Sequence, residues 1–283
     1  MHLRILTINV QNREGDPRRL GLLNQELRRL DPDIVALQEV LDADHLAELL
    51  EGTGLHGTHQ SEAMAYTPPF ADRYGGNAIA SRLPHRIVEV LDLRLAGAAD
   101  VPWCTLAARV TLPDEGEVLF ISATASWRLD AEAVREQQAV ALSDLDARHR
   151  TELPTIIAGD FNAAPEAASI RYLTGRQSLS GRSVHYHDAW EVAGDGPGHT
   201  WSSDNANAAA LLDQIVRQPG HRRRIDYVFT GSWHAHPRAR CEIRSATLAF
   251  DQPTDGVHPS DHYGVVVDVE IGRDGRRGVH HMS

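Results

Sequence analysis

The chain has 283 residues and a mass of 31.2 kDa, with 42% hydrophobic and 24% charged residues, a balance that is typical of a globular enzyme and excludes a mini-protein, a fibre or a disordered chain. All 28 basic residues are arginine, which excludes the lysine chemistry of Schiff bases and of the Walker A loop. With 39 acidic residues the net charge is −11, so no positive field attracts nucleic acid over a long range.

The first forty residues predict a strand, a helix and a second strand. Residues 3–10 are apolar and rich in β-formers, which predicts a buried strand. Asp16-Pro17 is a typical helix start, and leucines at 20, 23, 27 and 30 then form one apolar stripe that ends at Asp31-Pro32-Asp33. Residues 34–39 predict the next strand, which ends on the carboxylate of Glu39.

Strands and helices continue to alternate along the rest of the chain. Further strands are predicted at residues 77–80, 101–110, 118–125, 155–158, 225–230 and 263–271, and helices at 42–50, 131–149 and 166–173. No Pro/Gly/Ser-rich linker and no repeat interrupts this pattern. We therefore expect one α/β domain over residues 1–271. Residues 272–283 have no apolar periodicity, and we expect a flexible tail there.

The cysteines and the N-terminus bear on the compartment. Cys104 and Cys241 are too few for a disulfide framework or a four-cysteine zinc site, which fits a reducing environment. No run approaches the roughly 20 apolar residues of a membrane span. Met1 leads into an apolar strand pattern without the features of a signal peptide. We expect a cytoplasmic monomer that does not bind membranes.

Polar residues gather at the ends of the predicted strands. Asn9 and Glu39 end the first two strands, Asp160 and Asn162 follow the strand at 155–158, Asp226 opens another strand, and Asp261-His262 precedes the last one. Strand ends at one rim of a sheet are neighbours in space, so residues that are far apart in sequence can converge there. Each residue alone is better explained as a turn or edge residue. Together they predict a site.

The donors in this set are mostly carboxylate and amide oxygens. Such oxygens suit Mg²⁺ or Mn²⁺ rather than zinc, and these ions in enzymes commonly bind phosphate. A carboxylate beside an imidazole, as in Asp226 with His262, fixes the tautomer and favours the protonated form. The residues alone therefore favour metal-assisted chemistry on an anionic substrate.

Six short motifs in order give the chain a specific resemblance. They are Thr7-Ile8-Asn9-Val10, Val35-Ala36-Leu37-Gln38-Glu39-Val40, Gly76-Asn77-Ala78-Ile79-Ala80-Ser81-Arg82, Ala158-Gly159-Asp160-Phe161-Asn162, Arg224-Ile225-Asp226-Tyr227-Val228 and Ser260-Asp261-His262. From about residue 3 to residue 271 the chain resembles the endonuclease/exonuclease/phosphatase (DNase I-like) superfamily. The resemblance implies a four-layer α/β/β/α sandwich of two mixed sheets, with the site at one end.

The same resemblance implies roles for these residues. Glu39 would be the principal metal ligand, with Asn9 and Asp261 near the ion. Asp160 would orient or deprotonate the attacking water. Asn162 would contact the phosphate, and His262, held by Asp226, would donate a hydrogen bond to a phosphate oxygen. Further candidates for substrate binding are Asn77, Thr124, Arg73, Arg128 and Arg224.

One position departs from the family pattern. Relatives carry Ser-Thr-His-Leu-Ser-Trp with a catalytic histidine, where this chain has Thr124 and Ala125 in place of His and Leu; the match resumes at Ser126-Trp127. Threonine cannot carry a positive charge near neutral pH and reaches less far than imidazole. Losing a donor to the transition state typically costs about 10² to 10³ in rate.

Two functions follow from this departure. The favoured one is Mg²⁺-dependent phosphoester hydrolysis on a phosphorylated or small-molecule substrate. Nucleic acid is possible as a substrate, although the missing basic stripe does not favour it. The alternative is a repurposed relative that uses the metal as a Lewis acid on a small molecule or only binds a ligand. A purely structural role and a two-carboxylate glycosidase are weaker alternatives.

Overall fold

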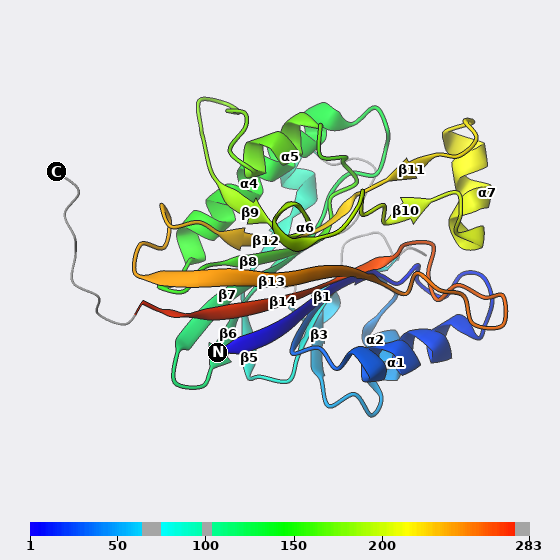
Figure 1. Cartoon of the computed structure of the whole chain (residues 1–283), viewed down its shortest axis with the longest axis horizontal. Helices are drawn as coiled ribbons and strands as arrows, with labels where there is room; N and C mark the ends of the chain where they lie inside the picture. The colour runs from blue at the N-terminus through cyan, green and yellow to red at the C-terminus, as the bar shows by residue number, and fades with distance from the viewer. Residues whose placement is uncertain (64–74, 98–103, 275–283) are drawn as a thin grey trace.

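The computed structural model describes residues 1–63, 75–97 and 104–274, and its strands form two mixed six-stranded sheets packed face to face (Figure 1). The first sheet has the spatial order β13 (Ala239–Ala249), β14 (Gly264–Arg273), β1 (His2–Asn9), β2 (Ile34–Val40), β4 (Gly76–Ser81) and β3 (His56–His59). The second has the order β5 (His85–Asp92), β6 (Cys104–Leu112), β7 (Gly116–Thr124), β8 (Ile156–Asp160), β12 (Asp226–Gly231) and β9 (Tyr186–Asp188). The β1/β2 and β7/β8 pairs are parallel.

Helices cover the outer face of each sheet. The first sheet is covered by α1 (Arg19–Leu30) and α2 (Ala43–Leu50), and the second by α4 (Glu132–His149) and α5 (Ala168–Leu173). Shorter elements are α3 (Gln60–Ala63), a 3₁₀ turn at Leu93–Ala96, α6 (Ala189–Ala193), α7 (Ala206–Ile215) and a ribbon of β10 (Trp201–Ser202) and β11 (Arg222–Arg223). None of the helices within the described ranges is long and apolar enough to cross a membrane.

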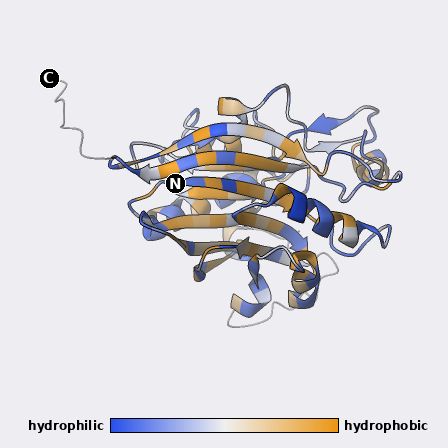
Figure 2. Cartoon of the chain, turned by 60° about the horizontal axis from the view of Figure 1, so that its bottom comes forward, coloured by the Kyte–Doolittle hydropathy of each residue, from blue (hydrophilic) through white to orange (hydrophobic). Residues whose placement is uncertain are grey.

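The alternation of side chains along the strands produces the layers. Ile5 of β1 points between the sheets, where it belongs to one buried cluster with Phe120 of β7. The next residue, Leu6, points outward and packs with Leu23 and Leu27 of α1. Adjacent strand residues face opposite sides, so a strand that is covered on both sides is apolar throughout. The strands accordingly carry most of the orange in Figure 2, and the predicted four-layer sandwich is confirmed.

Several predicted boundaries shift. Helix α1 starts at Arg19 rather than at Asp16-Pro17, because residues 16–18 form a turn in which the Asp16 carbonyl accepts from the Arg19 amide. Strand β14 extends to Arg273, two residues into the predicted tail, while residues 275–283 lie outside the described part. The predicted strand at 101–110 is observed as β6, with residues 101–103 also outside.

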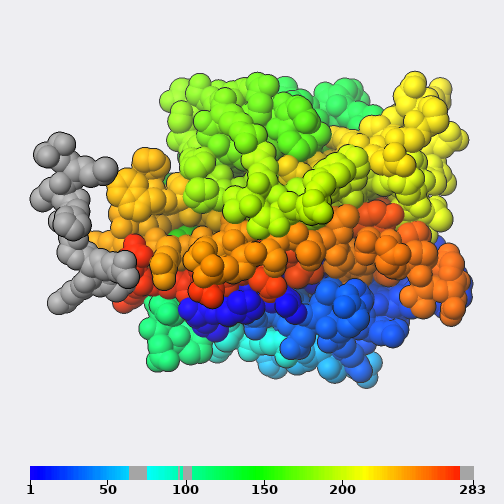
Figure 3. All heavy atoms as spheres, in the orientation of Figure 1, coloured from blue at the N-terminus to red at the C-terminus, as the bar shows by residue number. Residues whose placement is uncertain are grey.

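The sequence analysis missed several elements, of which β13 is the longest. Figure 3 shows β13 and β14 as an orange and red band across this face of the molecule. Strand β13 lies at the edge of its sheet, and Arg240, Glu242 and Arg244 on its outer side interrupt the apolar pattern. Strands β3, β5 and β9 and helices α3, α6 and α7 were also not predicted, and the two-residue strands β10 and β11 are too short to give a periodic signal.

Candidate active site

Asn9 connects the two sheets at the end where β1 finishes. Its Nδ2 atom lies 3.1 Å from Oε1 of Glu39 on β2 and 3.3 Å from Oδ2 of Asp160 on β8. Its Oδ1 accepts from the amide of Gln11, and the Ser260 hydroxyl donates to its main-chain oxygen. One buried amide therefore bridges two carboxylates that come from different sheets.

The backbone at Glu39 is irregular. Its φ angle is 56°, in the left-handed region that glutamate rarely adopts, and the β2/β4 register shifts between Leu37 and Val40. Such strain costs about 1–3 kcal/mol and is concentrated at functional sites. Burial, followed by the charge of Asp261, raises the pKa of Glu39 to about 8. The fold thus holds a carboxylate where its ionisation is unfavourable unless a cation is nearby.

Asp160 lies in a row across three strands of the second sheet. It pairs with Thr124 on β7 and with Asp226 on β12. Gly159 makes this close packing possible, because a Cβ atom there would lie 1.9 Å from the carbonyl oxygen of Ala123. Burial, followed by the charge of Asp226, raises the pKa of Asp160 to about 7. A carboxylate with a pKa near neutrality is suited to accept a proton from water.

His262 and Asp226 form a buried pair. Nδ1 of His262 lies 3.0 Å from Oδ2 of Asp226, while Oδ1 of Asp226 is buried without a hydrogen-bond partner in the described structure. Burial alone lowers the pKa of His262, but the charges of Asp226 and Asp160 and the hydrogen bond to Asp226 raise it well above its usual value. Trp201 packs at a tilt against the imidazole, with ring centroids 6.2 Å apart. The pair therefore favours the protonated form of the imidazole.

Thr124 ends β7 beside Asp160, and its side chain is engaged within the fold. Its hydroxyl donates to Oδ1 of Asn77 at 2.7 Å, and Nδ2 of Asn77 donates to the Cys104 carbonyl at 2.7 Å. Asn77 and Thr124, both predicted as substrate-binding candidates, thus bind each other and are buried.

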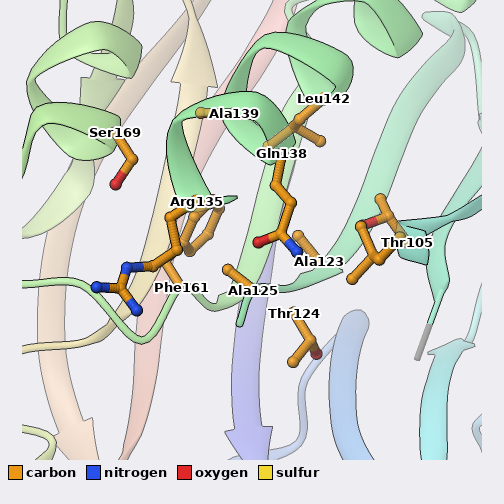
Figure 4. A pocket seen from close by; sticks show the side chains of 11 residues that line it. Thr105, Ala123, Thr124, Ala125, Arg135, Gln138, Ala139, Leu142, Phe161 and Ser169 are labelled. Atoms are coloured by element: carbon orange, nitrogen blue, oxygen red, sulfur yellow. The ribbon is translucent and has the colours of Figure 1, made fainter. Parts of the chain in front are cut away.

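A small cavity of about 20 Å³ lies between β7 and α4, and Thr124 lines it (Figure 4). It has room for about one water molecule. Ala125, where the family resemblance expects leucine, lines it as well, as does Ser169, whose buried hydroxyl has no partner among the described residues. Gln138 on the far wall donates to the Ser126 hydroxyl at 3.0 Å.

Arg19 is a site residue that the sequence analysis did not identify. Its side chain is 2% exposed, and its guanidinium donates to the carbonyls of Val10, Gln11, Glu14 and Pro259. These carbonyls belong to the loop after Asn9 and to the loop before Asp261. Burial lowers the pKa of Arg19, while the charges of Asp261 and Glu39 oppose this effect. Arg19 therefore holds two site loops together and places a positive charge behind their carboxylates.

The other predicted arginines lie differently. Arg224 is buried and pairs with Asp188 at 2.7 Å, with its guanidinium above the Tyr227 ring, so the structure does not bring it to the cluster around Asp160. Arg128 is exposed and pairs with Asp130. Arg73 lies outside the described residues. Arg223 is the member of the run at 222–224 that reaches the site, where its Nη2 donates to the carbonyl of Asn162 at 3.0 Å.

Comparisons with known proteins assign the chain to a family. The sequence profile of the Endonuclease/Exonuclease/phosphatase family matches residues 6–262. Protein angel of Drosophila melanogaster is 28% identical over 222 residues, which cover 73% of this chain and 60% of that protein. The chain therefore spans less than two thirds of this curated relative.

Solved structures share the fold. TDP2 of D. rerio, in a complex with a single-strand DNA product, superposes with a TM-score of 0.70 at 19% identity, over 95% of this chain and 99% of that one. The catalytic domain of human Nocturnin with a bound sulfate anion gives a TM-score of 0.65 at 19% identity, covering 95% and 94%. Two mixed sheets flanked by helices are the DNase I-like fold that this chain shares with these structures. The chain belongs to the endonuclease/exonuclease/phosphatase family.

Enzymes of this family depend on divalent metal ions. Glu39 and Asp261 offer carboxylate oxygens of the kind that hard cations bind, while Asn9 directs its Nδ2 toward Glu39 and its Oδ1 toward the Gln11 amide. Ligand atoms of Asp160, Asp226 and His262 also lie within 4.8 Å of one another. A protonated His262 has no lone pair for a metal, however, and its positive charge already balances these two aspartates. Glu39 and Asp261 form no ion pair with any described residue, although the charge of Arg19 acts on both.

Proposed function

We propose that this protein hydrolyses phosphodiesters with Mg²⁺ or Mn²⁺ bound at Glu39, with Asn9 and Asp261 beside the ion. A divalent ion at this position supplies Lewis-acid stabilisation of negative charge on the phosphate. The single observation that carries the proposal is the Asn9 bridge, which holds the metal-side carboxylate of Glu39 next to Asp160 on the opposite sheet. In this proposal the bridge therefore brings Glu39, which binds the ion, close to Asp160, which binds the attacking water.

The remaining groups divide the other tasks. Asp160, with its raised pKa, orients the attacking water and accepts its proton. His262 donates a hydrogen bond to a nonbridging phosphate oxygen as charge builds there, and Asp226 keeps the imidazole protonated and aligned. Asn162, 8% exposed and in a left-handed backbone conformation beside Asp160, donates one amide N–H to the Ala125 carbonyl and contacts the phosphate with the other.

A short nucleotide-containing phosphodiester is the substrate class that we propose. The D. rerio TDP2 structure holds a single-strand DNA product on the same fold, which supports a nucleotide substrate. The net charge of −11 opposes long duplexes, which are bound chiefly by neutralising many phosphates. A single strand or a dinucleotide needs fewer such contacts.

The hydrogen bond between Thr124 and Asn77 supports a second candidate. A site that lacks the second imidazole has lost a phosphate donor, so the metal could instead polarise a carbonyl or an enolate of a small molecule. In that case metal binds and no phosphodiester is cleaved.

One experiment separates the two candidates. Release of p-nitrophenol from bis(p-nitrophenyl) phosphate is measured with Mg²⁺ and with Mn²⁺ for the parent, Glu39→Ala and Glu48→Gln. Glu48 is an exposed glutamate that pairs with Arg13 and serves as the matched control. We expect turnover in the parent and in Glu48→Gln and none in Glu39→Ala. Metal binding by calorimetry without turnover would favour the small-molecule alternative, and no metal binding at millimolar concentration would refute both.

A further inference from the structure

Arg223 differs from its two neighbours in the run of three arginines. Arg222 is exposed and pairs with Asp204 at 2.7 Å, and Arg224 is buried and pairs with Asp188 at 2.7 Å. Within the described part of the chain, Arg223 is half-buried and has no ion-pair partner. A half-buried guanidinium without a carboxylate is costly, because its desolvation is not compensated. Such a group commonly has a partner that is not part of the protein.

The fold fixes where Arg223 points. It pairs across the β10/β11 ribbon with Trp201, whose ring packs against His262. Its Nη2 donates to the carbonyl of Asn162, two residues after Asp160. A guanidinium has five N–H donors, and the other nitrogens of this one are not among the buried atoms that lack a partner. Because these nitrogens also form no hydrogen bond to a described residue, they are accessible to solvent beside Asn162.

A second guanidinium, that of Arg135, lies near Arg223 and contacts the loop after β7. Arg135 of α4 donates through Nη1 to the carbonyls of Ser126 and Arg128, and Nδ2 of Asn162 donates to the carbonyl of Ala125. The loops after β7 and β8 are thus joined, and each loop accepts from one guanidinium: the buried Arg135 for the first and the half-buried Arg223 for the second. Burial, followed by the charge of Arg135, lowers the pKa of Arg223, while the charge of Asp160 acts in the opposite direction. Arg135 forms an ion pair with Glu132 at 2.8 Å, whereas Arg223 forms none with the carboxylates of residues 1–63, 75–97 and 104–274.

We propose that Arg223, backed by Arg135, binds a second phosphate of the substrate next to the one that is cleaved. This inference rests on the proposed function, since it places an additional anion beside the same Asp160. The planar fork of arginine binds phosphate oxygens in a bidentate manner, and the neighbouring positive charge of Arg135 makes an anion the favoured partner. The substrate class narrows to phosphodiesters that carry another phosphate one nucleotide away.

The test compares three dinucleotides with Mg²⁺: TpT, pTpT and TpTp. In the parent we expect one of the two terminally phosphorylated forms to exceed TpT in kcat/KM by about tenfold or more, as one charge-assisted contact allows. Which form gains shows on which side of the scissile bond the second phosphate lies. Arg223→Met should reduce that ratio to near one, and Arg223→Lys, which keeps the charge without the fork, should keep part of it.

Arg222→Met is the matched control, because it removes an exposed, ion-paired arginine from the adjacent position and should leave the ratio unchanged. A parent that cleaves all three dinucleotides without preference would overturn the second-phosphate site and leave the proposed function standing. A preference that survives Arg223→Met would overturn it as well. A parent that cleaves none of the three refutes the proposed function and this inference together. Thermal unfolding of each variant shows whether a changed ratio reflects loss of the fold, which would lower all three rates equally.

Discussion

The hydroxyl of Thr124 donates a hydrogen bond of 2.7 Å to Oδ1 of Asn77. The position where the family resemblance expects imidazole is therefore occupied by a side chain that is bound within the sandwich. We expect Thr124→His to raise the turnover of an activated phosphodiester by up to about 10², the usual effect of one transition-state donor. The measurement is kcat with Mg²⁺, and no gain in rate would show that another group has replaced the imidazole.

Thr124→Val is the control for that change. It keeps the volume but removes the hydroxyl, so that the buried Oδ1 of Asn77 loses its donor. We expect it to lower the free energy of unfolding by about 1–3 kcal/mol and to bring no gain in turnover.

The cavity beside Ala125 leads to a second prediction. Ala125→Leu restores the family residue but adds three carbon atoms, more than a space for about one water molecule holds, and should lower the free energy of unfolding by about 1–3 kcal/mol. Urea denaturation with a fixed m-value measures the change. A gain in stability would mean that the cavity widens to accept leucine.

The raised pKa of Glu39 gives a pH dependence of stability. The folded metal-free protein holds this proton up to about pH 8, whereas the unfolded chain releases it near the ordinary value of 4.5. The contribution of Glu39 to the free energy of unfolding is therefore full below about pH 4.5 and falls as the pH rises to about 8. Metal-free Glu39→Gln should melt at least about 2 °C above the parent at pH 8 and close to it at pH 5.

Metal ions should reduce or reverse the difference in melting temperature between the parent and Glu39→Gln. At pH 8 Mg²⁺ should raise the melting temperature of the parent and of Asp226→Asn, and it should not raise that of Glu39→Gln. If Mg²⁺ stabilises Glu39→Gln but not Asp226→Asn, the ion binds at Asp160, Asp226 and His262 instead.

Asp226→Asn tests the charge state of His262. Removing the carboxylate deletes the strongest influence that raises the imidazole pKa, so His262 should lose its proton at a lower pH. We expect kcat to fall by about 10² at pH 8 and the alkaline limb of the rate profile to move at least about one pH unit toward acid. Asp204→Asn, on the surface, should leave the profile in place. An unchanged alkaline limb in Asp226→Asn would show that His262 is not the proton-bearing group.

Arg19 is expected to matter for both stability and metal binding. Arg19→Met leaves the buried carbonyls of Val10 and Pro259 without their donor, which should lower the free energy of unfolding by about 2–5 kcal/mol. It should also weaken Mg²⁺ binding, measured by calorimetry, because the loops beside Asn9 and Asp261 are released. Arg18→Met is the control, since Arg18 is exposed and pairs with Asp16. Equal effects of the two substitutions would contradict this role.

Sequence analysis predicted well those elements whose structure follows from the pattern of neighbouring residues in the sequence. Strands β1, β2 and β8 are apolar along most of their length because both faces are covered, and each ends close to a polar residue, as with Asn9 and Asp160. Strand β13 was not predicted, because its charged outer face looks like a loop in sequence. Its place at the sheet edge becomes evident only once β14 is present beside it.

The positions of the arginines at the site could not be predicted from the sequence either. In a run of three, nothing in the sequence distinguishes the exposed Arg222, the half-buried Arg223 and the buried Arg224. Arg19 is the first residue of α1, where a charged residue usually faces solvent, yet its partners are carbonyls as far along the chain as Pro259. Long-range contacts decide these cases, and periodicity does not report them.

Under the proposed function, the Asn9 bridge makes catalysis depend on the thickness of the hydrophobic core. Glu39 and Asp160 are fixed to opposite sheets, so their separation is set by side chains such as Ile5 and Phe120 that fill the space between those sheets. A substitution that changes side-chain volume between the two sheets would therefore change the distance from Glu39 to Asp160 without altering either residue. Drift in core packing among relatives is thus a route by which evolution can tune or silence the enzyme.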